Sequence, residues 1–340
     1  MITKQITTPT GHICTTKAEK GMLEFLSIGD YGKDMNIKAD FLGMDKEIDG
    51  VPNGPIMPLE WKWVVTISTQ YGCSMGCRFC DVPLVGPGKN ATENDLEMQV
   101  LEALTLFPDV KATERLNIHY ARMGEPTFNP AVLAFSRRLK EVCAERLPGS
   151  LIHPVLTTMM PKRNAGLAKF LHQWAEIKNG YFAGDAGLQI SLNSTNDEQR
   201  EYMFNGESRS LEDISALLAW LPKPVGRKYT LNFAWADDYE TDGEKCAALF
   251  PPEKFMVKIT PIHANKRSVE NGIKTSGGYE FYAPYRKPEK AFKDAGYDTL
   301  IFIPSVDEDR GMITCGNAVL MGREPDNQVT EIKYRNMATL

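Results

Sequence analysis

The chain shows two different patterns of apolar and polar residues. From residue 63 onward, short β-branched or apolar runs alternate with longer stretches whose apolar residues recur at helical spacing. The runs predict strands at Trp63–Thr69, Arg115–Ala121, Ile152–Thr157, Gly187–Leu192, Tyr229–Trp235, Phe255–Pro261 and Thr299–Ile303. The stretches between them predict helices at Glu93–Phe107, Pro130–Leu147, Asn164–Lys178, Leu211–Leu221, Gly243–Leu249 and Lys287–Asp294.

This alternation predicts an α/β fold of six strand–helix repeats. Parallel strands joined by helices form either a partial (βα)6 barrel or an open doubly wound sheet, and in both the reactive groups gather at the carboxyl ends of the strands. The N-terminal part differs, because Gly21–Gly32 and Met35–Leu42 predict a β-hairpin. We therefore expect a small β extension in residues 1–55, a barrel in residues 56–320 and a polar C-terminal tail in residues 321–340.

Composition narrows the class of protein. The 340 residues are 42% hydrophobic, which is enough for a substantial core. No apolar run reaches the roughly 18 residues that a membrane span requires, and the first residues lack the order of a secretory signal. The sequence therefore predicts a globular, cytoplasmic protein with no membrane partner.

The charge is unevenly distributed along the chain. The whole chain carries a formal charge of −5, whereas the segment Lys254–Lys293 carries +6. Its basic residues are interleaved with Tyr279, Phe281, Tyr282 and Tyr285. This mixture suits phosphates and stacked bases, and it equally suits a solvated loop whose aromatic side chains pack beneath it. RNA, a nucleotide or another anionic substrate satisfies the same charge.

Three of the seven cysteines lie together directly after the first predicted barrel strand. Cys73, Cys77 and Cys80 have the spacing Cys-x3-Cys-x2-Cys, and no other Cys or His occurs between Cys14 and His119. A structural zinc site requires four protein ligands. Three thiolates suit a 4Fe–4S cluster that keeps one iron open for a small molecule. The spacing therefore favours an iron–sulfur cluster over zinc.

The cysteine spacing, with an aromatic residue before the last cysteine, resembles the radical S-adenosylmethionine (SAM) superfamily. Four later motifs resemble the RlmN/Cfr family, whose members methylate adenosine in RNA: Met123-Gly124-Glu125-Pro126, the runs 190–198 and 232–238, and Ile313-Thr314-Cys315-Gly316-Asn317. The resemblance covers roughly residues 59–320. It implies a radical SAM barrel, a 4Fe–4S cluster on the three cysteines, and SAM as cofactor.

Several residues at strand ends are candidates for binding SAM. Gly124 and Glu125 form a loop after the second strand, where the carboxylate can accept hydrogen bonds from the SAM ammonium group. Ser191, Leu192 and Asn193 provide hydroxyl, backbone and amide groups for its ribose or carboxylate. The alternatives are that Glu125 is an ordinary solvated loop acid, that Ser191 begins a turn and that Asn193 caps the next helix.

Two further SAM-binding candidates depart from the family in residue type. Thr157, with Thr158 beside it, ends the third strand where the family has a SAM-binding serine. His263 follows the sixth strand where the family has an asparagine that meets the adenine. An isolated histidine is also commonly a structural residue, so the His263 assignment depends on position alone.

Cys315 is the candidate catalytic residue. It lies beyond the last predicted strand, and its alternative role is that of a small buried apolar residue. In the family the matching cysteine is methylated by one SAM. A 5′-deoxyadenosyl radical from a second SAM then removes hydrogen from that methyl group, and the resulting methylene radical adds to the substrate. A thiol suits this covalent role because sulfur accepts a methyl group by polar attack.

Two family features differ in this chain. The family's second cysteine, seven positions before the first cluster ligand, corresponds to Thr66. The glutamate base on the preceding β segment corresponds most nearly to Asn36, with Asp34 and Asp40 close by. The N-terminal RNA-binding extension of RlmN also lacks a counterpart, since fewer than about 60 residues precede the first barrel strand. These differences predict altered resolution of the covalent adduct and an altered substrate.

Together these features predict a radical SAM methyltransferase that moves a SAM-derived methyl carbon through Cys315 to an sp2 carbon. An adenine-containing RNA or nucleotide is the expected substrate, and a reducing electron donor such as flavodoxin or ferredoxin is the expected partner. One alternative is a radical SAM enzyme that takes hydrogen directly from a non-RNA substrate. Another is a non-enzymatic iron–sulfur or zinc protein that holds nucleic acid.

Overall fold

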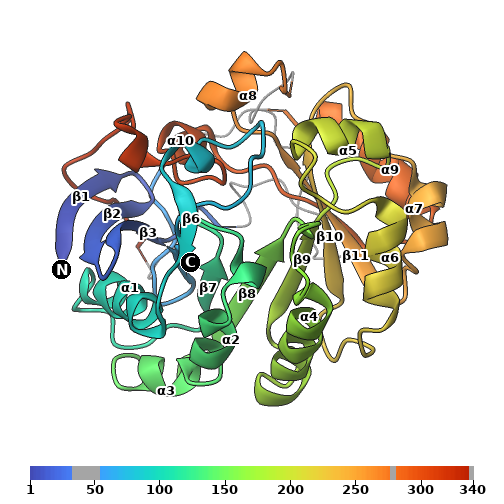
Figure 1. The fold of residues 1–340 in the computed structure, drawn as a ribbon. Helices are drawn as coiled ribbons and strands as arrows, with labels where there is room; N and C mark the ends of the chain where they lie inside the picture. The colour runs from blue at the N-terminus through green and yellow to red at the C-terminus, as the bar shows by residue number, and fades with distance from the viewer. Residues whose placement is uncertain (33–53, 276–280, 337–340) are drawn as a thin grey trace.

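The computed structural model describes residues 1–32, 54–275 and 281–336, which contain a ten-stranded sheet (Figure 1). The order of its strands is β1 (Ile2–Thr8), β2 (Gly11–Ala18), β3 (Gly21–Ile28), β4 (Trp63–Ile67), β7 (Leu116–Tyr120), β8 (Ile152–Thr158), β9 (Gly187–Ser191), β10 (Tyr229–Trp235), β11 (Phe255–Pro261) and β12 (Thr299–Ile301). The strands from β4 to β12 are parallel, and β1 to β3 add an antiparallel edge. The predicted α/β class, with a partial barrel and an N-terminal β extension, is confirmed.

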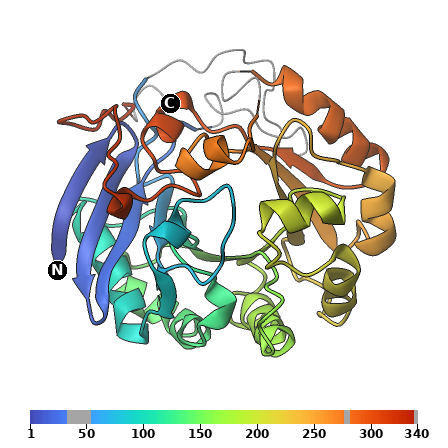
Figure 2. The ribbon, with the colours of Figure 1, turned by 45° about the horizontal axis from the view of Figure 1, so that its top comes forward.

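Helices cover the outer side of the curved sheet (Figure 2). They include α1 (Glu93–Thr105), α2 (Ala131–Ser136), α3 (Leu139–Ala144), α4 (Leu167–Glu176), α6 (Leu211–Ala219), α7 (Gly243–Leu249) and α9 (Arg286–Asp294). Strand residues that face these helices are apolar and fully buried, as for Val65, Ile118, Leu188 and Leu231. The alternate strand residues face the concave side, because successive side chains of a strand project to opposite faces.

The N-terminal strands belong to the sheet itself. β3 pairs with β2 on one edge and with β4 on the other, where Leu26 lies opposite Thr66. The predicted hairpin paired Gly21–Gly32 with Met35–Leu42, but β3 has β2 on one side and β4 on the other, and Met35–Leu42 lies outside the described residues. Leu26 packs in one cluster with Met312 and Val319. The β extension therefore supports a segment from near the other end of the chain.

The predicted helix at Pro130–Leu147 was wrong in its continuity, because α2 ends at Ser136 and α3 begins a new helix. The Ser136 hydroxyl donates to the Val132 carbonyl at 2.6 Å and lies 2.7 Å from the Tyr120 hydroxyl. A serine that bonds to the carbonyl four residues earlier commonly bends a helix. The helix therefore breaks where its serine meets the sheet.

Three short helices were not predicted: α5 (Asp197–Met203), α8 (Lys266–Glu270) and α10 (Val306–Arg310). Their five to seven residues are mostly polar and show no helical period. Each begins instead at a capping side chain, which is Asn196, Asn265 or Ser305. All three follow a barrel strand or its extension, so they surround the carboxyl ends of the strands.

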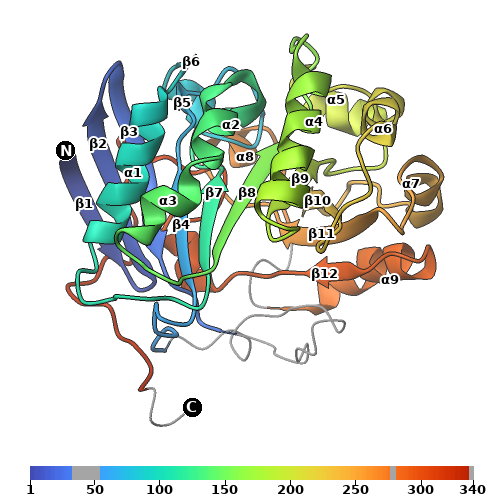
Figure 3. The same ribbon diagram turned by 90° about the horizontal axis from the view of Figure 1, so that it is seen from below.

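The C-terminal residues return to the N-terminal edge of the sheet. The Val329 N–H donates to the Thr7 carbonyl at 3.0 Å, and the Arg335 N–H donates to the Ile56 carbonyl at 2.8 Å. This edge lies opposite the edge formed by β12 (Figure 3). In the described part of the chain, no helix combines the length and the apolar character needed to cross a membrane.

Candidate active site

The three clustered cysteines lie in a loop at the carboxyl end of β4. The short strands β5 (Gln70–Gly72) and β6 (Pro87–Asn90) pair antiparallel and close this cysteine loop, residues 73–86, at its base. Gly88 permits the closure, because it has φ +81° and a Cβ there would lie 2.0 Å from the Ser74 nitrogen. The cysteine loop is therefore shaped mainly by residues close to it in the sequence.

The three thiols share a buried, apolar environment. Cys73, Cys77 and Cys80 pack together with Met75, Met159, Phe204 and neighbouring aromatic residues. Burial raises the pKa of all three thiols, that of Cys73 to about 12, and their mutual repulsion as thiolates adds to the rise for Cys77 and Cys80. Three thiolates can therefore exist here only with a compensating positive charge, such as that of bound metal.

The arrangement suits a cluster better than a single ion. Within residues 1–32, 54–275 and 281–336, no three Cys, His, Asp or Glu side chains converge on one metal position. A tetrahedral zinc site needs four ligands around one ion. In a cubane cluster each thiolate binds a different iron, so the sulfurs stand apart. Three thiols on one short loop fit a 4Fe–4S cluster with one iron left for a further ligand.

Glu125 lies in the loop after β7, close to the cysteines. Its carboxylate accepts hydrogen bonds from the Thr127 N–H at 3.2 Å, from the Thr127 hydroxyl at 2.7 Å and from the Met159 N–H at 3.0 Å. Only 4% of Glu125 is exposed, and burial raises its pKa despite these donors. The alternative of an ordinary solvated loop acid is therefore wrong. A buried carboxylate with neutral donors suits a cationic ligand group.

Gly124 and Gln70 join the Glu125 loop to the cysteine loop. Gly124 has φ +100°, and a Cβ there would lie 2.6 Å from the Gln70 Cβ. The Gln70 Oε1 accepts hydrogen bonds from the Glu125 N–H at 3.0 Å and the Ser74 N–H at 3.2 Å. The Gly124 N–H bonds to the Cys73 sulfur and opposes the rise in its pKa. The sequence analysis missed Gln70, whose only signal was its place after a barrel strand.

Thr157 and Ser191 lie at the carboxyl ends of the neighbouring strands β8 and β9. Both are half-buried and alternate with the buried residues Thr158 and Ile190, so they face the concave side. The Thr158 hydroxyl accepts a hydrogen bond from the Met160 N–H at 3.0 Å. Of the two threonines, Thr157 is thus the one that faces the space in which SAM is predicted to bind.

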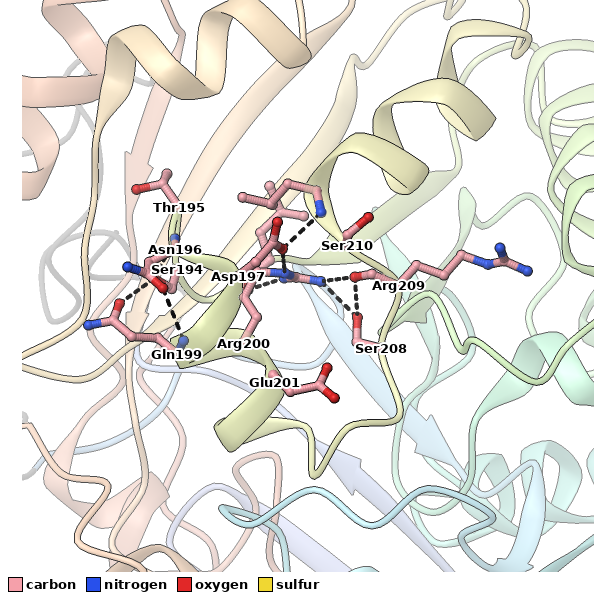
Figure 4. A network of polar contacts seen from close by, with 12 residues as sticks. Ser194, Thr195, Asn196, Asp197, Gln199, Arg200, Glu201, Ser208, Arg209 and Ser210 are labelled. Carbon is pink, nitrogen blue, oxygen red and sulfur yellow. Dashed lines mark hydrogen bonds and ion pairs between the residues drawn. The ribbon is translucent and has the colours of Figure 1, made fainter.

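A buried arginine supports the backbone after β9 (Figure 4). The Arg200 guanidinium donates to the carbonyls of Ser191 and Leu192, and to the Ser208 hydroxyl at 2.7 Å. Burial lowers the pKa of Arg200 to about 10. The Leu192 N–H bonds to the Asn232 carbonyl at 2.9 Å. The Leu192 backbone, predicted to contact SAM, is therefore engaged within the protein.

The Asn193 side chain is also used within the fold. Asn193 has a left-handed backbone with φ 64°. Its Oδ1 accepts a hydrogen bond from the Ala234 N–H at 3.0 Å, and its Nδ2 lies 3.1 Å from the Met203 sulfur. The cap of α5 is Asn196, so the alternative that Asn193 caps this helix is wrong. Asn193 instead turns the chain from β9 into α5.

His263 follows β11 as predicted and has a partner that the sequence did not reveal. Its Nδ1 lies 3.0 Å from the Asp309 carboxylate of α10. Its backbone carbonyl accepts a hydrogen bond from the Ser268 hydroxyl at 2.8 Å. These contacts tie the loop after β11 to α8 and α10, which is the structural alternative considered for this histidine.

The structure brings Cys315 to the cysteine loop. Cys315 is exposed, so the alternative of a small buried residue is wrong. Its thiol is close enough to Cys80 to contribute to the raised pKa of Cys80. The Asp81 N–H donates to the Gly316 carbonyl at 2.8 Å, and the Asn265 amide donates to the same carbonyl at 3.3 Å. The sequence analysis missed Asp81 and Asn265, because their contacts join distant parts of the chain.

The basic segment does not form one surface. Lys254 donates to carbonyls at the end of α6. Four other basic residues of the segment lie on α9, on the outside of the barrel. Tyr282 and Tyr285 are buried, so the alternative of packed aromatic side chains is confirmed for these two. Arg267 of α8 is different, because its guanidinium donates to the Gly76 carbonyl of the cysteine loop at 3.2 Å. Only part of the segment therefore reaches the site.

The counterparts of the family's remaining residues are partly described. Thr66 lies on β4, half-buried, opposite His119 of β7. Burial and the nearby Lys258 charge lower the pKa of His119 to about 3, so this imidazole is neutral at physiological pH. Asn36, Asp34 and Asp40 lie outside the described residues.

Comparison with known proteins identifies distant relatives. The dual-specificity RNA methyltransferase RlmN of Sorangium cellulosum is 26% identical over 270 residues, which are 76% of this chain and 62% of that protein. The RlmN of Solidesulfovibrio magneticus is 27% identical over 62% of this chain and 57% of its own length. The RlmN of Campylobacter lari is 29% identical over 76% and 70%. The chain thus spans less than two thirds of the first two relatives. No protein-family model matches it.

A solved structure shares the fold. A radical SAM methyltransferase from Sphaerobacter thermophilus matches with a TM-score of 0.61 over 93% of this chain and 80% of that chain. The two sequences are 16% identical, so this likeness concerns the fold alone. It agrees with the partial barrel described above.

Proposed function

We propose that this chain, a distant homologue of the RlmN RNA methyltransferases, is a radical SAM methyltransferase that passes a SAM-derived methyl carbon through Cys315 to an sp2 carbon. One observation carries the proposal. The exposed Cys315 is held at the cysteine loop, because the carbonyl of the next residue, Gly316, accepts a hydrogen bond from the Asp81 N–H at 2.8 Å, although the two segments come from opposite ends of the barrel sequence. A thiol beside a cluster site and open to solvent can meet both SAM and a substrate.

The three thiols of the cysteine loop would hold the 4Fe–4S cluster. When bound, the cluster supplies the electron that cleaves SAM to a 5′-deoxyadenosyl radical. Glu125 would hold the SAM ammonium group, since its buried carboxylate has neutral donors on both oxygens. Thr157 and Ser191 would line the concave side next to it. These roles follow the family motifs and the burial of each group.

Cys315 would act as the methyl carrier. Its sulfur would form a bond to the SAM methyl carbon as the bond from that carbon to the sulfonium breaks and the thiol proton leaves. The protein would then hold the methyl carbon as a thioether at the mouth of the barrel. Exposure suits this role, because the carrier must present the carbon to a second molecule.

An adenine-containing RNA or nucleotide is the proposed substrate. The relatives are named RNA methyltransferases. At the cysteine loop, the Arg78 guanidinium lies 4.5 Å from the ring centre of Tyr202, which is 43% exposed. Together with Arg267 of α8, this pair offers cationic and aromatic surface to phosphates and bases. A reducing electron donor such as flavodoxin or ferredoxin and a cytoplasmic location belong to the same proposal.

The test uses anaerobic protein reconstituted with iron and sulfide. SAM with a deuterated methyl group and a reductant are added, 5′-deoxyadenosine is quantified, and the peptide that contains Cys315 is weighed by mass spectrometry. We expect 5′-deoxyadenosine and a methylated Cys315. Cys315→Ala should abolish methylation of the peptide, and Cys246→Ala, at a buried cysteine of α7, should not. Unmodified Cys315 alongside 5′-deoxyadenosine would reject the carrier role.

Thr66 favours one alternative. It stands where the family has its second cysteine, so release of a covalent adduct must proceed differently, or no such adduct forms. In the alternative, a radical SAM enzyme removes hydrogen directly from another substrate. Deuterium from the SAM methyl group in 5′-deoxyadenosine supports the methyl carrier. Deuterium from labelled substrate, and none from SAM, supports the alternative.

A further inference from the structure

A buried ion pair joins the N-terminal extension to the barrel. Glu24 lies on β3, and Arg122 lies just after β7, two residues before Gly124. The Arg122 Nε donates to Glu24 Oε1 at 2.6 Å, and its Nη2 donates to the same oxygen. The two side chains are 2% and 0% exposed. Two opposite charges are thus withdrawn from water together.

The remaining polar atoms of this pair bind the Cys315 segment, residues 311–320. The Glu24 Oε2 accepts hydrogen bonds from the Val319 N–H at 3.0 Å and the Leu320 N–H at 3.2 Å. The Arg122 Nη1 donates to the Met312 carbonyl at 3.0 Å. The pair therefore forms hydrogen bonds to the segment on both sides of Cys315.

The backbone of the Cys315 segment has two left-handed residues. Met312 has φ 53°, a left-handed conformation that costs energy in a residue with a side chain. Gly316, with φ +94°, is the second left-handed residue around Cys315, and the cysteine loop holds its carbonyl. The segment is thus fixed at three points, and Cys315 stands between them as the exposed residue.

We infer that the Glu24–Arg122 pair is a positioning element that sets where Cys315 stands relative to the cysteine loop. This inference rests on the proposed role of Cys315. Stability alone is a weak reason for such a pair, because well-packed apolar residues often replace a buried ion pair at no cost. Apolar residues cannot supply three directed hydrogen bonds to the backbone at 312, 319 and 320. The pair also lies next to the Glu125 loop, so it links the predicted SAM-binding loop to the predicted methyl carrier.

The main test uses the double variant Glu24→Met with Arg122→Met, which removes both charges at once. Amide hydrogen exchange of residues 312–320 is measured in the full chain without added iron or SAM, so the result does not depend on activity. We expect exchange of the Val319 and Leu320 amides to rise at least about tenfold, since each loses its acceptor. Exchange in β8 should stay unchanged. Unchanged exchange at 319 and 320 would overturn the inference.

The variant Arg122→Lys separates the two contacts, and it remains informative if the double variant does not fold. The lysine keeps a charge beside Glu24 and loses the fork that reaches the Met312 carbonyl. We expect slow exchange at 319 and 320 with faster exchange at residues 313–315. The same rates as in the wild type across 312–320 would argue against a role for Arg122. Removing the exposed pair Arg138–Glu93 by Arg138→Met is the matched control and should leave the segment unchanged.

A functional readout distinguishes the failure of this inference from that of the proposed function. Reconstituted double variant should still form 5′-deoxyadenosine, while methylation of Cys315 per 5′-deoxyadenosine falls at least about tenfold. Equal methylation in variant and wild type would overturn the positioning role and leave the carrier role intact. If the wild type itself does not methylate Cys315, the proposed function fails, and the exchange experiment still decides whether the pair holds the segment.

Discussion

Two cysteine sites meet in this molecule, and they are held in opposite ways. Cys73, Cys77 and Cys80 lie on one loop that its own ribbon, β5 with β6, closes at the base. Cys315 lies on a segment held by side chains from β3, from the loop after β7 and from the loop after β11. In the first site Cys77 is buried and the other two cysteines are partly buried, whereas Cys315 is exposed.

The difference shows how one site can combine a loop that is fixed by its own backbone pairing with an exposed side chain. Under the proposed function the cysteine loop needs fixed sulfur positions, and short-range backbone pairing provides them. A group that meets two different molecules needs exposure, so it cannot be buried in the core that would fix it. Long-range hydrogen bonds then replace burial as the means of holding it. Three experiments each break one of these two sites, and a fourth tests the buried carboxylate of Glu125 next to the cysteine loop.

The largest effect is expected from Cys80→Ala. It removes a predicted cluster ligand next to Asp81, whose N–H donates to the Gly316 carbonyl of the Cys315 segment. Iron content after reconstitution and 5′-deoxyadenosine formation should both fall to background, because two thiols cannot replace three. Cys143→Ala changes a buried cysteine in α3 and should leave both measurements intact. Full iron content in Cys80→Ala would contradict the ligand assignment.

The second experiment damages the local scaffold without touching a sulfur. In Gly88→Ala the new Cβ would lie 2.0 Å from the Ser74 backbone nitrogen, and the residue would keep a left-handed conformation. Overpacking and backbone strain together should cost about 2–5 kcal/mol in free energy of unfolding. Iron binding should weaken in proportion, as measured by titration with absorbance spectroscopy. Gly149→Ala, where φ is +79° and no atom lies within 4 Å, isolates the backbone strain alone.

The third experiment disturbs the Cys315 site alone. In Gly316→Ala the new Cβ would lie 2.8 Å from the Asn265 amide and 3.2 Å from the Phe79 carbonyl oxygen. We expect a loss of about 1–3 kcal/mol in free energy of unfolding and a drop in Cys315 methylation, with iron content unchanged. Gly322→Ala, at φ +80° with no close atom, is the control. Equal loss of iron binding would show that the two sites are not separable.

The smallest effect concerns the charge of Glu125. Burial raises the pKa of this carboxyl in the folded protein, so the folded state binds more protons than the unfolded state at pH values just above the ordinary pKa. The stability contributed by Glu125 is therefore present at low pH and is lost as the pH rises through the raised pKa. The amide in Glu125→Gln does not titrate.

Thermal unfolding of the protein without SAM measures this effect. The midpoint of the wild type minus that of Glu125→Gln should become smaller between pH 4 and pH 8, by on the order of 2 °C for each kcal/mol. Saturating SAM should stabilise the wild type more than the variant, if the carboxylate binds the SAM ammonium group. A difference that does not vary with pH would contradict the burial of a titrating charge.

Much of the fold was readable from local pattern. The strands at Tyr229–Trp235 and Phe255–Pro261 and the helix at Gly243–Leu249 have the predicted bounds. These elements bury one face against the helix layer, so their apolar period records their environment directly. The helices α5, α8 and α10 were missed, because a capping side chain starts each one and no period follows.

The residues of the candidate site also differ in whether a local sequence pattern points to them. Cys73, Cys77, Cys80 and Glu125 were predicted because each stands in a short motif after a strand. Gln70, Asp81 and Asn265 were missed, since each acts through a hydrogen bond to a distant loop. Asn193 and Leu192 stand in a motif of the same kind, yet the structure uses them within the fold.

The sequence by itself determined the class of fold, the candidate residues that follow each strand and the spacing of the three thiols. These features depend on residues within a few positions of one another. Only the tertiary structure decided that the segment around Cys315 contacts the cysteine loop at Asp81, and that Glu24 and Arg122 hydrogen-bond to the backbone of this segment. The physical reason is that the packing of distant elements brings a buried charge to its partner. The sequence around Glu24 or Arg122 has no pattern that identifies the other residue.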